Sequence, residues 1–83
     1  MKLPILAAAL LVATPVLALD LVPDTELGKT ETEVRTALTE LGYDVRNIEM
    51  EDGEIEAYVV KDGQMAEVYV DPASGKIQNI EDK

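Results

Sequence analysis

Few residues in this chain could carry out covalent or metal chemistry. The sequence has no histidine and no cysteine, and its one serine, Ser74, lies in the turn-forming stretch Asp71-Pro72-Ala73-Ser74-Gly75. Histidine is the usual general base, cysteine is the usual thiol nucleophile, and both bind transition metals. A serine becomes a nucleophile only beside an oriented base, and this turn offers none. We therefore expect no catalytic residue, no enzyme activity and no cofactor.

The abundant ionisable groups are carboxylates. The chain has 17 acidic residues against 7 basic ones, for a net charge of −10. Such a charge repels nucleic acid and anionic membrane surfaces, so neither is expected as a partner. The acidic stretch Glu51-Asp52-Gly53-Glu54 is too short to form a calcium-binding loop of the EF-hand type. We expect no dedicated metal site, and weak binding or buffering of cations such as calcium stays open as the alternative function.

The first 18 residues are typical of a secretory signal peptide. Lys2 supplies the positive charge, residues 5–13 form the apolar region, and Val16-Leu17-Ala18 resembles a signal-peptidase site. The apolar region is interrupted by prolines and is shorter than the ~20 residues that span a bilayer. The sequence therefore predicts cleavage after Ala18, a periplasmic or secreted protein, and no membrane association after cleavage.

The remaining chain begins with an irregular lead-in over residues 19–29, followed by one helix. Thr30 and Glu33 form a capping box that starts the helix, and Gly42 is placed to end it. Four apolar residues in between recur at helical spacing and form one stripe. These are Val34, Ala37, Leu38 and Leu41. The pattern predicts a helix over residues 31–41.

After the helix, the hydrophobic period changes to two, which is typical of strands. Asp52-Gly53 and Asp62-Gly63 are both signals for type I′ hairpin turns. Centring the hairpins on these turns fixes the register of three strands, and Ile77 begins a fourth after the turn at residues 71–76. The sequence predicts an α+β fold in which one helix packs on a three- to four-stranded antiparallel meander sheet.

The predicted register leaves a second sheet face, away from the helix, with mixed chemistry. It carries Tyr58, Val60, Met65 and Tyr69 together with carboxylates, among which Glu49 lies opposite Glu56. Three interpretations remain open. The face is solvated, or apolar residues of the lead-in cover it, or it contacts a partner, since tyrosine and methionine are enriched in interfaces. In the third case an outer strand adds to the contact by pairing with an incoming chain.

The span EVRTALTELGYDVRNIEMEDGEIEAYVVKDGQMAEVYVDPASGKI, residues 33–77, resembles a PepSY domain. That family has a helix ending in a Leu-Gly-Tyr-like step, two strands, and a closing strand of the form EVYVDPxTGxI. Residues 67–77 match this closing pattern, with Ser74 at the threonine position. The resemblance implies a PepSY-like domain over residues 30–83, in which Asp71, Pro72 and Gly75 are structural and hold the last strand and its turn.

The resemblance also implies a function. PepSY domains occur in propeptides of secreted metallopeptidases and in membrane or periplasmic proteins, and they are thought to restrain peptidases. We therefore expect a protein-binding module whose partner is a protein, with a peptidase as the candidate, and a monomer or weak homodimer. Because no protease domain follows Lys83, any such restraint is expected to act in trans. The expected contact residues are Tyr58, Val60, Met65 and Tyr69.

Overall fold

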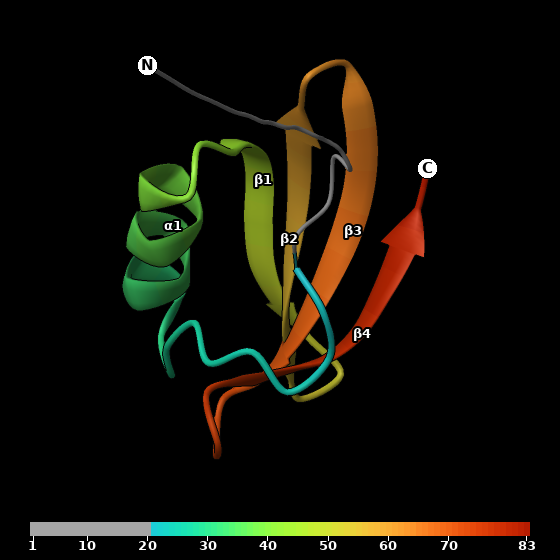
Figure 1. Cartoon of the computed structure of the whole chain (residues 1–83). Helices are drawn as coiled ribbons and strands as arrows, with labels where there is room; N and C mark the ends of the chain where they lie inside the picture. Colours follow the sequence, from blue (N-terminus) through green and yellow to red (C-terminus); the bar gives the residue numbers. More distant parts are fainter. Residues whose placement is uncertain (1–20) are drawn as a thin grey trace, which may run out of the picture.

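The computed structural model describes residues 21–83 as one helix and a four-stranded antiparallel sheet (Figure 1). The strands lie in the order β1-β2-β3-β4, and α1 packs against β1 and β2. This arrangement confirms the predicted α+β fold, and of the three to four strands predicted the sheet has four. The elements are α1 Glu31–Glu40, β1 Asp44–Glu51, β2 Glu54–Lys61, β3 Gln64–Asp71 and β4 Lys76–Asp82. The predicted signal peptide and its cleavage site after Ala18 lie outside the described residues.

The caps of α1 follow from the residues that flank it. Thr30 Oγ1 accepts the amide of Glu33 at 3.1 Å, and Glu33 Oε1 accepts the amide of Lys29 at 2.8 Å. Gly42 follows the helix with φ 93°, which is favourable for glycine. Val34 and Leu38 are fully buried, but Leu41 is 43% exposed. The prediction that Leu41 extends the apolar stripe is wrong, because this residue is the C-cap and lies past the last regular turn.

Both predicted hairpin turns are present. Asp52 and Asp62 have φ 53°, and the glycine after each has φ 81°, so both central residues have the positive φ of a type I′ turn. The register agrees with the prediction, for example in Val59 opposite Ala66. A bulge between Val45 and Asn47 turns Val45 toward the core, opposite Val59. A second bulge, which was not predicted, shifts the pairing with β4 between Tyr69 and Val70.

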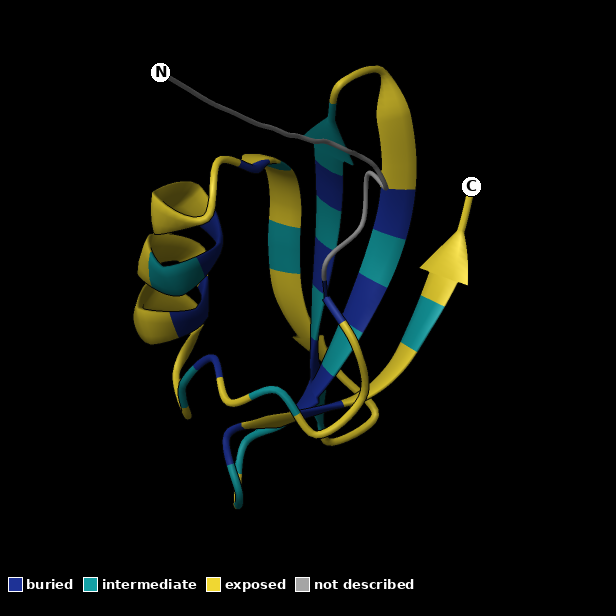
Figure 2. Ribbon diagram, in the orientation of Figure 1, coloured by how far each residue is buried: buried dark blue, intermediate teal, exposed yellow. Residues whose placement is uncertain are grey.

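The core lies between the sheet and a layer made of α1 and the lead-in (Figure 2). Leu21 and Leu27 of the lead-in belong to this core, at 5% and 7% exposure. The lead-in also pairs with the start of β4, where the amide of Asp24 donates to the carbonyl of Ile77 at 2.8 Å. The interpretation that the lead-in covers the second sheet face is therefore wrong for residues 21–29, which pack on the helix side.

Two glycines bring the lead-in, the helix and the last turn together. The amides of Leu27 and Gly28 donate to the carbonyl of Gly75 at 2.8 and 3.2 Å. A Cβ at Gly28 would lie 2.5 Å from the Cβ of Glu33, and a Cβ at Gly75 would lie 3.2 Å from the carbonyl oxygen of Gly28. Both residues also have positive φ, so any side chain here is strained.

Within residues 21–83, no helix has the length and apolar character needed to cross a bilayer.

Candidate functional site

The four predicted contact residues lie together on the sheet face opposite α1, which we call the second face. Val60 on β2 is directly opposite Met65 on β3, and Tyr58 is opposite Glu67. Tyr69 on β3 is opposite Glu56 on β2, two residues further along each strand. Met65 is exposed, while Tyr58, Val60 and Tyr69 are half-buried by their neighbours on the sheet. The structure thus gathers these side chains into one patch, whose role as a contact surface stays a prediction.

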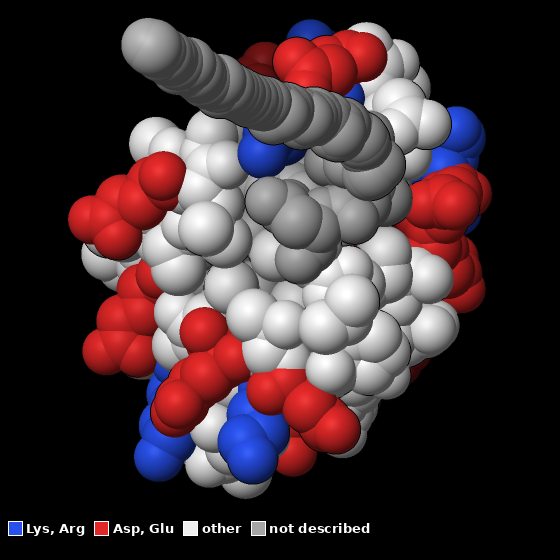
Figure 3. All heavy atoms as spheres, in the orientation of Figure 1, with Lys and Arg blue, Asp and Glu red and all other residues white. Residues whose placement is uncertain are grey.

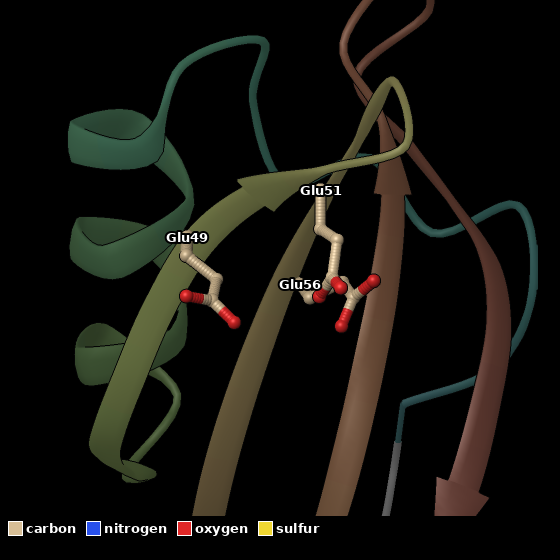
Figure 4. Close-up of side chains that lie close together, drawn as sticks. All are labelled: Glu49, Glu51 and Glu56. Atoms are coloured by element: carbon tan, nitrogen blue, oxygen red, sulfur yellow. The ribbon is translucent and has the colours of Figure 1, made fainter.

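Carboxylates border this patch on the side of β1. One carboxylate oxygen from each of Glu49, Glu51 and Glu56 lies within 4.8 Å of the other two. Figure 4 looks onto the second face and shows the three side chains projecting from β1 and β2, away from α1. We call these three residues the glutamate cluster. Glu49 lies opposite Glu56, as the register predicted.

The surroundings of Glu56 raise the pKa of its carboxyl group. Partial desolvation is the largest cause, followed by the charge of Glu51 and a hydrogen bond with Glu67, and together they raise the pKa of Glu56 to about 7. Near neutral pH this carboxyl is therefore protonated in a large fraction of molecules. Desolvation and a hydrogen bond with Glu67 likewise raise the pKa of Tyr69 well above its usual value.

The described ion pairs involve other carboxylates than the glutamate cluster. Lys83 Nζ is 3.4 Å from both Glu67 Oε1 and Glu81 Oε1. Arg46 Nε lies 2.7 Å from Asp44 Oδ2 in an exposed pair. Among residues 21–83, no lysine or arginine forms an ion pair with a member of the glutamate cluster. The uncompensated negative charge of this face is therefore concentrated on β1 and β2.

Other carboxylates are spread over the rest of the surface. On the side that carries α1 and the lead-in, acidic side chains, with lysines and arginines beside some of them, lie around a largely uncharged area (Figure 3). Any test of the glutamate cluster must therefore separate its local effect from that of the overall negative charge.

The remaining predicted residues form the turn before β4. Asp71 Oδ1 accepts the amide of Ala73 at 3.0 Å, and the amide of Gly75 donates to the Asp71 carbonyl at 2.6 Å. Pro72 is the first residue inside this turn. The hydroxyl of Ser74 donates to Asp71 Oδ2 at 3.4 Å and accepts the amide of Lys76 at 3.2 Å. All of these bonds lie within the turn itself.

Sequence reasoning missed two residues that shape the site. Glu51 joins Glu49 and Glu56 across the first hairpin, although the correct register already placed it on the second face. Lys83 bridges two strands of that face from the end of β4. Placing Lys83 near Glu67 requires the register between β3 and β4. That register cannot be read from the alternation of residues, because a bulge shifts it between Tyr69 and Val70.

The described residues thus form a small acidic α+β module with one sheet face covered by a helix and the other bearing tyrosines and carboxylates. No pocket opens among them.

Comparison with known proteins identifies the class more closely. The family model of the PepSY type described as "Peptidase propeptide and YPEB domain" matches residues 2–81, and the chain belongs to this family. The resemblance seen in the sequence is thereby confirmed. PepSY domains are propeptide-like or inhibitor-like modules rather than catalytic domains, and they are typical of exported proteins. No curated protein and no solved structure matches the chain.

Proposed function

We propose that this chain is an exported PepSY module that binds a protein partner through its second face and restrains a peptidase in trans. The observation that carries the proposal is the patch of Tyr58, Val60, Met65 and Tyr69 on the sheet face that α1 and the lead-in leave uncovered. Tyrosine and methionine are enriched at protein interfaces. Tyrosine offers a large apolar ring with a polar hydroxyl, and methionine offers a flexible apolar side chain that adapts to its partner.

An outer strand supports the same mode of binding. β1 is at one end of the sheet, and no described strand pairs with its outer edge. At the other end, the start of β4 is already paired, because the amide of Ile77 donates to the carbonyl of Thr25 at 2.8 Å. An incoming extended chain could therefore add to β1 with backbone hydrogen bonds and place side chains on the second face.

Replacing both tyrosines tests the contact surface. We expect Tyr58→Ser with Tyr69→Ser to weaken capture of the partner from periplasmic extract by about tenfold or more, since aromatic anchors typically carry much of an interface. Capture is measured with the immobilised chain and quantitative mass spectrometry. If a captured protein is a peptidase, its hydrolysis of casein should fall on addition of the wild type and not of the double variant.

The matched control removes exposed apolar area elsewhere. Val22 and Leu41 are 57% and 43% exposed and lie outside the second face. The double variant Val22→Ser with Leu41→Ser should capture the same protein at full strength, and circular dichroism should report a native fold in both variants. Equal capture by the tyrosine variant and the wild type would exclude the second face as the contact surface.

Export has a direct test. We expect mass spectrometry of the protein recovered from the periplasm or medium to give a mature chain that begins at Leu19, because Val16-Leu17-Ala18 fits the site cut by signal peptidase. Replacement of Ala18 by a bulky residue should leave a larger, uncut precursor. A recovered protein that still carries Met1 would contradict the proposed signal peptide.

Cation binding is the second candidate, and the glutamate cluster is the observation that favours it. Calcium takes 6–8 oxygen ligands, so three carboxylates on a sheet face cover only part of its coordination sphere. Calorimetric titration with calcium chloride separates the candidates. A stoichiometric site of about micromolar affinity, lost on replacing Glu51 by glutamine, favours cation binding, whereas weak and unsaturated heats favour the protein-binding module.

A further inference from the structure

The glutamate cluster and the two tyrosines meet around a single residue. Glu56 on β2 has Glu49 directly opposite it on β1 and Tyr69 directly opposite it on β3. Tyr58 lies two residues further along β2 on the same face, which is about 7 Å away. A group placed over Glu56 would therefore be within reach of carboxylates on one side and of aromatic rings on the other.

This surface carries negative charge that no lysine or arginine in residues 21–83 compensates by an ion pair with the cluster. Arg46 pairs with Asp44, and Lys83 pairs with Glu67 and Glu81. The cluster has no such partner among the described residues, and the raised pKa of Glu56 reflects its desolvation and, after that, its repulsion from Glu51. A cation arriving from outside would relieve this repulsion.

We propose that the partner presents a lysine- or arginine-bearing segment, which lies across β1, β2 and β3 with its cationic groups over Glu49, Glu51 and Glu56. The proposal rests on the proposed function and specifies the chemistry of the partner. The aliphatic stems of these side chains pack on Tyr58 and Tyr69, because long cationic side chains bury their methylenes and favour aromatic faces. Charge complementarity of this kind selects the partner and speeds its association.

The test uses a defined probe in place of the partner. The probe is a capped peptide of alternating alanine and lysine, and its counterpart carries glutamate in place of lysine. Each is titrated into the isotopically labelled chain of residues 19–83, and amide chemical shifts report both the affinity and the face that is contacted. We expect the lysine peptide to bind, with the largest shifts on β1 to β3, and the glutamate peptide not to bind.

Two matched variants separate the cluster from the overall charge. Glu49→Gln with Glu51→Gln and Glu56→Gln replaces the three carboxyl groups of the second-face cluster, and near pH 8 this removes close to three charges. Glu31→Gln with Glu40→Gln and Asp82→Asn removes three charges from exposed residues outside it. We expect the first variant to bind the lysine peptide about tenfold more weakly, and the second to bind it within about twofold of the wild type.

Unfolding would not account for this loss, because removing three crowded carboxylates relieves repulsion in the folded state. Equal weakening in the two variants would show attraction to the overall charge and would overturn the proposal. So would an absence of binding by the lysine peptide in low salt.

The failure of this inference is distinguishable from that of the proposed function. If the tyrosine variant loses the captured protein while the lysine peptide does not bind, the contact surface stands and its preference for a cationic segment is refuted. If capture is insensitive to both tyrosines, the proposed contact surface itself fails.

Discussion

A chain that begins at Thr30 is expected not to fold, although it retains the helix and all four strands. The truncation removes Leu21 and Leu27, which are buried at 5% and 7% exposure beside α1. Loss of a buried leucine side chain costs about 2–5 kcal/mol. A domain of this size has a total stability of about 3–9 kcal/mol, so the loss of both leucines removes most or all of it. The start of β4 also loses its pairing with residues 24–27.

Thermal melts followed by far-UV circular dichroism test this expectation against the chain that begins at Leu19. The double variant Leu21→Ala with Leu27→Ala, in the longer chain, is the sharper version because it leaves the backbone pairing intact. It should lower the melting temperature by about 15 °C or more, or abolish the transition. The control Val22→Ala changes an exposed residue next to Leu21 and should have little effect. A cooperative melt of the Thr30 chain near that of the longer chain would show that the lead-in is dispensable.

The elements that the sequence predicted well are those specified by local chemistry. Thr30 and Glu33 cap the helix, and each Asp-Gly pair sets a hairpin turn and thereby the register on both sides of it. These signals act within four residues of one another, so they can be read without knowledge of the rest of the fold. The α+β arrangement follows once the apolar sides of the helix and the sheet are matched.

The lead-in could not be placed in the same way. Leu21 and Leu27 have no helical or strand period, so the sequence does not say which face of the sheet they cover. Their position depends on contacts distant in sequence, above all the bonds from Leu27 and Gly28 to the carbonyl of Gly75. The requirement for glycine at residue 28 likewise arises from the approach of Glu33.

Only part of the candidate site could be predicted from the sequence, because the rest again depends on contacts between residues that are distant in sequence. Alternation along β2 and β3 is sufficient to place Tyr58, Val60, Met65 and Tyr69 on one face. To predict the glutamate cluster, one must also know which side chains on β1 and β2 lie close together. The sequence predicted the pairing of Glu49 with Glu56 but not the approach of Glu51. The uneven distribution of cations on this face depends on Lys83 and on the bulge before β4, which alternation alone does not give.

The folded chain is expected to become more stable as the pH falls from about 8 to about 5. The pKa of Glu56 is about 7 in the folded state, against 4.5 for an ordinary glutamate. Between these values the folded chain holds a proton that the unfolded chain has released, so folding takes up a proton and is favoured by acid. The gain begins as the pH falls through 7 and is complete near 4.5. The melting temperature should therefore rise by several degrees across this range.

Glu56→Gln identifies the residue responsible. This variant should melt at a higher temperature than the wild type at about pH 8 and should lose much of the pH dependence, because it carries no charge to be neutralised.

Added salt should also raise the melting temperature of the wild type at neutral pH, since about 0.3 M sodium chloride screens the repulsion among exposed carboxylates. Attractive pairs oppose both trends, chiefly Lys83 with Glu67 and Glu81, and Arg46 with Asp44. The ion pairs found in residues 21–83 are partly exposed and therefore weak, so repulsion should dominate. A melting temperature that falls with acid or with added salt would show that the attractive pairs outweigh the repulsion around Glu56.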